Sequence, residues 1–205
     1  MKKLLTDSNK SPNFIGSWNI ENDKLCNEII KFFEENKSLQ NKGMIGNKID
    51  PKKKQTIDIN INPSQLKDPK YSLFNSYFDL LNDCFVDYKK QYPFLNTFLQ
   101  KTHIGHFNVQ KYTPGDHFSL VHSERTGLGF LHRIFAWMTY LNNVEDGGTT
   151  NFEYYDIKVK PEIGKTLIWP AEWTHAHTGE VLKSGTKYIV TGWLHFPVKE
   201  TKKNE

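Results

Sequence analysis

At 205 residues the chain is long enough for one domain with a substantial buried core, and 14% of its residues are aromatic. Its formal net charge of +4 comes mostly from lysines in polar tracts, and the sequence contains only two arginines, Arg125 and Arg133. Arginine is the usual residue for reading bases and phosphates, so this composition argues against a nucleic-acid partner. No apolar run is long enough to cross a bilayer, and the N-terminus turns polar too early for a signal peptide. We therefore expect no membrane partner and a cytoplasmic location.

Two helices are predicted in the first half of the chain. Residues 23–35 carry apolar side chains at helical spacing, with Asn22 and Asp23 as cap residues. Residues 71–92 form a longer apolar stripe, which Pro93 ends. Between the two helices, residues 38–55 are rich in Gly, Asn and Lys and show no period, which predicts a mobile loop that serves as a lid. Residues 56–61 alternate between apolar and polar side chains, so we expect a half-buried strand there.

After residue 102 the helical period disappears and short β patterns follow one another, separated by Gly- and Pro-containing turns. The predicted strands are 103–112, 118–123, 131–142, 151–155, 157–160, 166–169, 175–178 and 187–196. Eight short strands after two helices predict a mainly β chain of the α+β class: a double-stranded β-helix (jelly roll) with the N-terminal helices packed on one sheet. We expect a single domain over 1–205, with helical support at about 20–95 and a catalytic core at about 103–197.

The stretch His122-Ser123-Glu124 is the first sign of chemistry. Residues i and i+2 of a strand point to the same face, so His122 and Glu124 can reach one cation together. A third ligand would complete the 2-His-1-carboxylate triad of non-haem Fe(II) oxygenases, which leaves coordination positions open. That ligand is expected from the segment 174–179, which contains His175 and His177. Both histidines would lie on one face of the predicted strand, so spacing alone does not choose between them.

Several ordered segments resemble one known family. They are Tyr112-Thr-Pro-Gly-Asp-His-Phe-Ser-Leu-Val-His122-Ser-Glu124, Tyr140-Leu-Asn, Gly147-Gly148-Thr-Thr-Asn-Phe152, Pro161-Glu-Ile-Gly164, Ile168-Trp-Pro170 and the run from His177 to Lys187-Tyr. Over roughly residues 104–196, about half the chain, this order is similar to the Fe(II)/2-oxoglutarate dioxygenases of the prolyl 4-hydroxylase type, especially the small bacterial and phage versions. One departure is Glu124, because most family members have aspartate there.

The resemblance implies roles for individual residues. His177 becomes the distal metal ligand because a lysine, here Lys187, follows it by ten residues, and His175 becomes a supporting or ordinary strand residue. Lys187 is expected to pair with the distal carboxylate of 2-oxoglutarate. Tyr140 falls where the family places a phenol bonded to the same carboxylate, and Tyr112 where an aromatic ring lines the cosubstrate pocket. Trp193 falls where a tryptophan backs the site.

The residues themselves support part of this interpretation. A lysine on a strand with Ile189 and Trp193 is costly to bury without a partner, and an incoming dicarboxylate supplies one. Thr191 shares this strand face and could also bond the cosubstrate. For Tyr112 and Tyr140, an ordinary role in the core is a serious alternative.

The rim of the site is less defined by the sequence. Arg125 and Trp173 are expected at the mouth of the site, together with Tyr112, where they could contact a peptide. For Arg125, an ordinary solvent-exposed position in a loop is an equally good interpretation. Arg133 on the central strand is expected to be structural.

The resulting hypothesis is an Fe(II)- and 2-oxoglutarate-dependent hydroxylase that uses O₂, with ascorbate as a further candidate requirement. A peptidyl proline in a peptide or protein is the expected substrate, and a free amino acid or other small molecule is the alternative. A cupin-like metal-binding sensor, a nucleic-acid demethylase and a zinc hydrolase are the competing classes. A sensor has no need of Lys187 or Tyr140, so their presence argues against that class. A demethylase needs a groove that contains arginines, and the chain has only two of them. The oligomeric state is left open.

Overall fold

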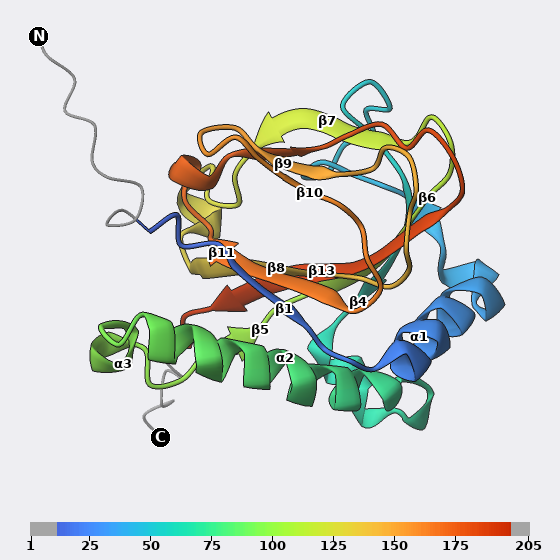
Figure 1. Cartoon of the computed structure of the whole chain (residues 1–205). Coiled ribbons are helices and arrows are strands. Elements are labelled where there is room, and N and C mark those ends of the chain that lie inside the picture. Colours follow the sequence, from blue (N-terminus) through green and yellow to red (C-terminus); the bar gives the residue numbers. More distant parts are fainter. Residues whose placement is uncertain (1–11, 198–205) are drawn as a thin grey trace, which may run out of the picture.

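The computed structural model describes residues 12–197. Two antiparallel sheets face each other, and the helices lie on the outer side of the larger one (Figure 1). The eight-stranded sheet has the order β1-β11-β8-β13-β6-β4-β2, with β5 paired to β13, and the five-stranded sheet has the order β10-β9-β12-β7-β3. This architecture confirms the predicted jelly roll with helices on one sheet.

The strands of the larger sheet are β1 (Gly16–Asn19), β2 (Asn41–Lys42), β4 (Ile57–Ile61), β5 (His103–Ile104), β6 (Phe107–Tyr112), β8 (Arg133–Tyr140), β11 (Lys165–Pro170) and β13 (Lys187–His195). The smaller sheet contains β3 (Lys54–Gln55), β7 (His117–His122), β9 (Thr150–Phe152), β10 (Ile157–Val159) and β12 (His177–Gly179). Short 3-10 turns are η1 (Lys37–Leu39), η2 (Pro63–Lys67), η3 (Pro69–Tyr71), η4 (Leu128–Phe130) and η5 (Trp173–His175).

The helices are α1 (Asp23–Glu35), α2 (Leu73–Gln91) and the short α3 (Leu95–Phe98). α1 begins where the Asn22 side chain accepts a hydrogen bond from the Leu25 amide, as the sequence predicts. Apolar side chains of α1 and α2 pack against β8, β11 and β13 in a core that is rich in aromatic rings. Among the described residues, no helix is both long enough and apolar enough to cross a membrane.

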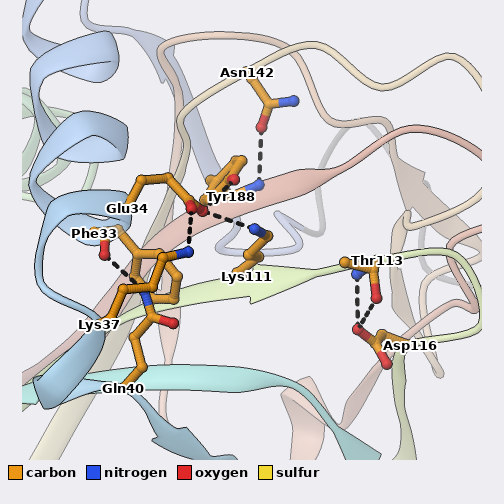
Figure 2. A network of polar contacts seen from close by, with 9 residues as sticks. All are labelled: Phe33, Glu34, Lys37, Gln40, Lys111, Thr113, Asp116, Asn142 and Tyr188. Carbon is orange, nitrogen blue, oxygen red and sulfur yellow. Dashed lines mark hydrogen bonds and ion pairs between the residues drawn. The ribbon is translucent and has the colours of Figure 1, made fainter.

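A polar cluster also fixes α1 to the sheet (Figure 2). The Glu34 carboxylate accepts hydrogen bonds from Lys111 Nζ on β6 and from the Tyr188 hydroxyl on β13, both at 2.7 Å, and from Lys37 Nζ at 3.0 Å. The Lys111 and Tyr188 bonds are the main reason that the pKa of Glu34 falls from 4.5 to about 2. These bonds hold the helix over the two strands that carry the floor of the cavity described below.

Glu34→Gln is expected to lower the free energy of unfolding by about 1–2 kcal/mol at pH 7, a value reduced for the 32% exposure of this side chain. Because the folded-state pKa is lowered, the stabilisation is present above the unfolded-state pKa and is lost as the pH falls through the folded-state pKa of about 2. Urea unfolding at pH 7 and pH 3 measures this, with Glu35→Gln as the matched control. If Glu34→Gln lowers the free energy of unfolding equally at pH 7 and pH 3, the ionised Glu34 carboxylate is not the source of the stabilisation.

The structure corrects three predicted strands. The strand predicted at 151–155 is β9, which ends at Phe152 where a turn begins. The strand predicted at 103–112 is divided into β5 and β6, because the chain at Gly105 passes the His195 ring so closely that an added Cβ would lie 2.1 Å from it. The strand predicted at 175–178 begins only at His177, since η5 occupies the preceding residues. The segment 38–55 is mostly loop, as predicted, but β2 pairs its beginning with β4 and β3 pairs its end with β7. The loop therefore connects the two sheets.

Candidate metal and cosubstrate site

Three potential metal ligands meet between the two sheets. His122 ends β7, His177 begins β12, and the two residues are paired in register. Glu124 Oε1 lies 3.9 Å from His122 Nε2 and 3.6 Å from His177 Nε2, and the three ligand atoms all lie within 4.8 Å of one another. Glu124 is beyond the end of β7, so strand alternation does not place it. Instead, its backbone N–H donates to the Ala171 carbonyl at 3.2 Å and turns the carboxylate back toward the histidines.

The remaining polar atoms of these side chains are already bonded to the protein. His122 Nδ1 lies 2.8 Å from the Leu120 carbonyl and His177 Nδ1 lies 3.0 Å from the His175 carbonyl. Each Nδ1 therefore carries the proton, which leaves both Nε2 atoms as electron-pair donors. Trp193 Nε1 donates to Glu124 Oε2 at 2.7 Å, so Oε1 is the oxygen left for a cation. The donor set fits a divalent metal with three protein ligands on one side.

Two further properties favour this donor set. Burial lowers the pKa of His177 to about 4, with the neighbouring His122 as a smaller cause, so the imidazole is neutral at pH 7 as a metal ligand must be. Arg133 Nη1 lies 3.8 Å from Glu124 Oε2 and donates to the Glu124 carbonyl at 3.1 Å. The Arg133 guanidinium also stacks 3.6 Å above the Trp193 ring. Arg133 was expected to be structural, but it supports the carboxylate directly; its sequence signal is a charge on an otherwise apolar central strand.

Trp193→Phe is expected to weaken metal binding about 10- to 100-fold, because Glu124 Oε2 loses its donor and the carboxylate can rotate. Titration of the apoprotein with Fe(II) under anaerobic conditions, or with Mn(II), measures the affinity. Trp18→Phe is the matched control. The Trp18 indole donates to Asp87 of α2, and Trp18 lies on β1, the edge strand of the larger sheet, which carries no metal ligand. Unchanged metal affinity in Trp193→Phe would show that this bond does not position Glu124.

Lys187 forms the other end of the site. Its side chain is 3% exposed, lies 4.0 Å above the Tyr112 ring, and donates from Nζ to the Gly148 carbonyl at 2.9 Å. No carboxylate of the described residues lies within ion-pair distance of Nζ, and burial lowers its pKa to about 7. A buried amine without a counter-ion fits a ligand that brings its own negative charge, such as a dicarboxylate.

The other predicted cosubstrate residues differ in their positions. Tyr112 lines the cavity beside Lys187, and its hydroxyl donates to Gln110 Oε1 at 2.9 Å. Thr191 also lines the cavity, but its hydroxyl donates to the Trp137 carbonyl at 2.9 Å. Tyr140 is fully buried and is not a lining residue; its hydroxyl lies 2.6 Å from Thr150 Oγ1, and Thr150 is the side chain that reaches the cavity.

Three candidates from the sequence lie away from the cavity. Arg125 forms an ion pair with Glu172 through Nη1 and donates from Nη2 to the Leu131 carbonyl, so both of its terminal nitrogens are occupied. Trp173 is 67% exposed and packs edge-on against Tyr154. The His175 ring is buried but is not part of the ligand cluster, and it bonds the Asn13 carbonyl from Nε2 at 2.8 Å. None of these residues lines the cavity.

The metal ligands and Lys187 share one cavity of about 1040 Å³, and the loop 41–49 forms part of its wall. Sequence reasoning missed a buried pair there: Lys54 Nζ on β3 lies 2.8 Å from Asp58 Oδ2 on β4, which also accepts from Gln110 at 3.1 Å. The alternation that identifies β4 as half-buried placed Asp58 on its polar face, but this face turns toward the cavity and not toward solvent. The pair joins the end of the loop to the cavity floor.

Residues 107–195 match the model of the 2OG-Fe(II) oxygenase superfamily. Two curated relatives are each 26% identical: a protein of Arabidopsis thaliana named as a probable prolyl 4-hydroxylase, over 124 residues, and a PKHD-type hydroxylase of Crocosphaera subtropica, over 110 residues. The alignments cover 48% and 50% of this chain and 43% and 48% of the relatives. The chain therefore spans about half the length of the curated relatives it matches.

Solved structures share the fold across most of the chain. A viral collagen prolyl hydroxylase from Paramecium bursaria Chlorella virus-1, in its 2OG complex, aligns with a TM-score of 0.62 at 19% identity, covering 90% of this chain and 97% of that one. A Pseudomonas putida prolyl-4-hydroxylase aligns with a TM-score of 0.67 at 16% identity, with 89% and 93% covered. A Trichoplax adhaerens prolyl hydroxylase, in complex with a peptide fragment of hypoxia inducible factor, aligns at 0.68 and 15%, with 92% and 85% covered.

The family match lies on the segment that carries the resemblance to prolyl 4-hydroxylases, and the structural neighbours have the same jelly roll. Both findings agree with the two histidines, the carboxylate and the buried lysine of the cavity. Through residues 107–195, this chain is similar to the 2OG-Fe(II) oxygenase superfamily.

Proposed function

We propose that this protein is an Fe(II)- and 2-oxoglutarate-dependent hydroxylase that acts on a peptidyl proline. The observation that carries the proposal is a single cavity in which three metal-ligating side chains lie on one side and a buried lysine lies at one end, with no counter-ion among residues 12–197. When bound, iron and 2-oxoglutarate supply the oxidation by O₂ that releases succinate and CO₂ and hydroxylates a C–H bond. The protein supplies the positions of the reactants.

The metal ligands divide the cavity into a protein side and an open side. His122, His177 and Glu124 would hold the cation from the protein side, with both imidazoles and the carboxylate fixed by their hydrogen bonds. This donor set would leave the opposite side of the cation accessible to the cosubstrate and O₂. Arg133 and Trp193 keep Glu124 Oε2 occupied, so that only Oε1 is directed toward the cation.

Lys187 would hold the carboxylate of 2-oxoglutarate that is distant from the metal. The ammonium is already directed by the Gly148 carbonyl and the face of Tyr112, so the cosubstrate meets a fixed cation and not a mobile one. Thr150 adds a hydroxyl at the same end, oriented by Tyr140 from behind. The cation at one end and the metal at the other fix the direction in which the cosubstrate lies.

A peptide substrate is supported by the relatives, and the cavity has room for part of a peptide. Its volume of about 1040 Å³ lies at the upper end of the range of about 300–1,000 Å³ that is usual for small-molecule sites. The named relatives are prolyl hydroxylases or a PKHD-type hydroxylase, and the Trichoplax structure contains a peptide. The same metal site would also serve a free amino acid, which is the second candidate substrate. We also propose that the enzyme requires ascorbate and that it is located in the cytoplasm.

Succinate release is the direct test of the proposed function. The protein is incubated with Fe(II), 2-oxoglutarate and ascorbate, and a proline-rich peptide library is compared with free proline. A peptide that gains the mass of one oxygen on proline, with succinate in equal amount, supports the proposal. If only free amino acids are turned over, the proposed peptide substrate is wrong and the assignment as an oxygenase stands. Omitting ascorbate tests whether the enzyme requires it.

The loop 38–55 is expected to close over the substrate. Its ends are held by β2 and β3, while Met44 and Ile49 within it are 53% and 54% exposed at the cavity wall. Hydrogen exchange of amides 43–50 should slow when a substrate peptide is added to the protein loaded with Mn(II) and 2-oxoglutarate. Exchange at the same rate with saturating peptide would exclude closure of the loop.

A further inference from the structure

The outer part of the cavity has an apolar rim on two sides. Met44 and Ile49 of the loop lie on one side, and Val121 of β7 and Phe130 of η4 come from the other segments that line the cavity. These side chains are 37–54% exposed, although each is large and apolar. Large apolar side chains that gather around a cavity opening mark a surface that a ligand covers. The rim is therefore suited to uncharged, apolar groups of the substrate.

The charges that line the cavity are nearly all matched within the protein. Lys54 is paired with Asp58 at 2.8 Å, and Glu124 is held by Arg133 and Trp193. Lys187 is reserved for the cosubstrate in the proposed function, and Lys42 stands at the outer end on the edge strand β2. A charged substrate side chain at the rim would lose water without gaining a partner, which is unfavourable.

A directed row of amide and imidazole groups runs from Asn62, outside the cavity, to Asn60, His106 and Asn108, which line its exposed part. Asn62 Nδ2 lies 3.1 Å from His106 Nε2, His106 Nδ1 lies 3.2 Å from Asn60 Oδ1, and Asn60 Nδ2 donates to Asn108 Oδ1 at 3.1 Å. One tautomer satisfies the whole row, with the His106 proton on Nδ1. The row ends at the Asn108 N–H₂ group, which has no hydrogen-bond acceptor among the residues that the structure describes.

Asn108 lies where a substrate at the metal would pass. It is paired with Asn60 on β4 and with Thr191 on β13, and all three line the cavity. Thr191 stands between Lys187 and Trp193 on the same strand face, and Trp193 contacts the metal carboxylate. Cross-strand neighbours lie about 5 Å apart, so the Asn108 amide lies beside Thr191, nearer to Trp193 and the metal carboxylate than to Lys187.

We propose that this groove selects an extended peptide whose residues beside the modified proline are uncharged. The Asn108 amide donates to a backbone carbonyl of the peptide, and the apolar rim of Met44, Ile49, Val121 and Phe130 covers the neighbouring side chains. An amide donor suits this purpose, because a backbone carbonyl is a neutral acceptor that every peptide residue provides. The inference rests on the proposed function, and it assigns the specificity of the same site.

Peptide binding without turnover tests the selectivity. The protein is loaded with Mn(II) and N-oxalylglycine, an unreactive analogue of 2-oxoglutarate, and three fluorescent proline-centred peptides are compared that differ only in flanking Val/Leu, Glu or Lys residues. The uncharged peptide is expected to bind about tenfold more tightly than either charged one, a difference of about 1.4 kcal/mol. Equal or tighter binding of the Glu or Lys peptide, or no binding of any peptide, overturns the inference.

Variants locate the selectivity on named residues. Asn108→Ala should raise the peptide KM about three- to tenfold with little change in kcat, the effect of losing one neutral hydrogen bond, and Asn108→Gln should recover part of it. Asn27→Ala on the exposed face of α1 is the matched control. Val121→Lys should improve binding of the Glu-flanked peptide about threefold, as an exposed ion pair would. Unchanged peptide KM in Asn108→Ala together with unchanged preference in Val121→Lys overturns the assignment.

The outcomes separate this inference from the proposed function. Selective binding of the uncharged peptide without succinate release supports the groove and contradicts the hydroxylase. Hydroxylation of all three peptides with equal kcat/KM supports the hydroxylase and contradicts the groove.

Discussion

His177→Ala is expected to abolish iron retention. The substitution removes one of three protein ligands and opens a space between the sheets. The two remaining ligands, His122 and Glu124, both lie at the end of β7, so the cation would be held from one side only. The neutral Nε2 of His177 is the ligand atom that is lost, since its Nδ1 is committed to the His175 carbonyl. Metal content after gel filtration, and titration with Mn(II), measure the loss. Circular dichroism checks that the variant is folded.

His175→Ala is the matched control for this experiment. The side chain bonds the Asn13 carbonyl and is not among the three clustered ligands, so its removal takes away no ligand. The His175 group that supports His177 is a backbone carbonyl, which alanine keeps. We expect the His175 variant to retain the metal with at most a modest loss of stability. If His175→Ala loses the metal and His177→Ala keeps it, the assignment of the third ligand is wrong.

Lys187→Ala is expected to raise the KM for 2-oxoglutarate by at least tenfold while leaving metal binding largely unchanged. A hydrogen bond to a charged group contributes about 1.5–3 kcal/mol, and a difference of about 1.4 kcal/mol is a factor of ten. Along β13, Ile189 and Thr191 separate Lys187 from Trp193, the residue that bonds the metal ligand Glu124, so the loss of Lys187 should act on the cosubstrate end. Lys183→Ala is the control, because this exposed lysine pairs with Asp146 at the surface.

The affinity for 2-oxoglutarate should also depend on pH through Lys187. Burial lowers the pKa of the free ammonium to about 7, and a bound carboxylate raises it again because the opposite charge favours the protonated form. The contribution of the ion pair is therefore complete below about pH 7 and is lost as the pH rises through the higher pKa of the complex. Calorimetry with Mn(II) at pH 6.5, 7.5 and 8.5, in buffers with different ionisation enthalpies, should detect proton uptake on binding above pH 7.

A wild-type protein that binds no 2-oxoglutarate in this calorimetric experiment would remove the hydroxylase from consideration. Binding with equal affinity at all three pH values, and without proton uptake, would show that Lys187 is already fully charged in the free protein. The first result concerns the proposed function, and the second concerns only the electrostatics of the lysine.

The sequence by itself determined the elements and the chemistry of the site. α1, α2 and β4 depend on apolar spacing over one segment and on local groups such as Asn22 and Pro93, so their periods are visible in the chain. The ordered motifs from Tyr112 to Lys187 indicated the family, and with it the metal and the cosubstrate. These features are local or depend on order along the chain, and neither requires knowledge of which strands become neighbours.

The tertiary structure decided how the side chains meet. The place of the His175 ring outside the ligand cluster depends on η5 and on the distant Asn13 carbonyl, while the orientation of Glu124 depends on Trp193 of another strand. Arg125 and Trp173 lie close to the site in sequence, yet Arg125 is held by Glu172 and Trp173 is exposed to solvent. The same holds for Asp58, whose polar face becomes the cavity floor only because the second sheet lies opposite. Alternation along a strand defines two faces, but the packing of the sheets determines which of them faces the cavity.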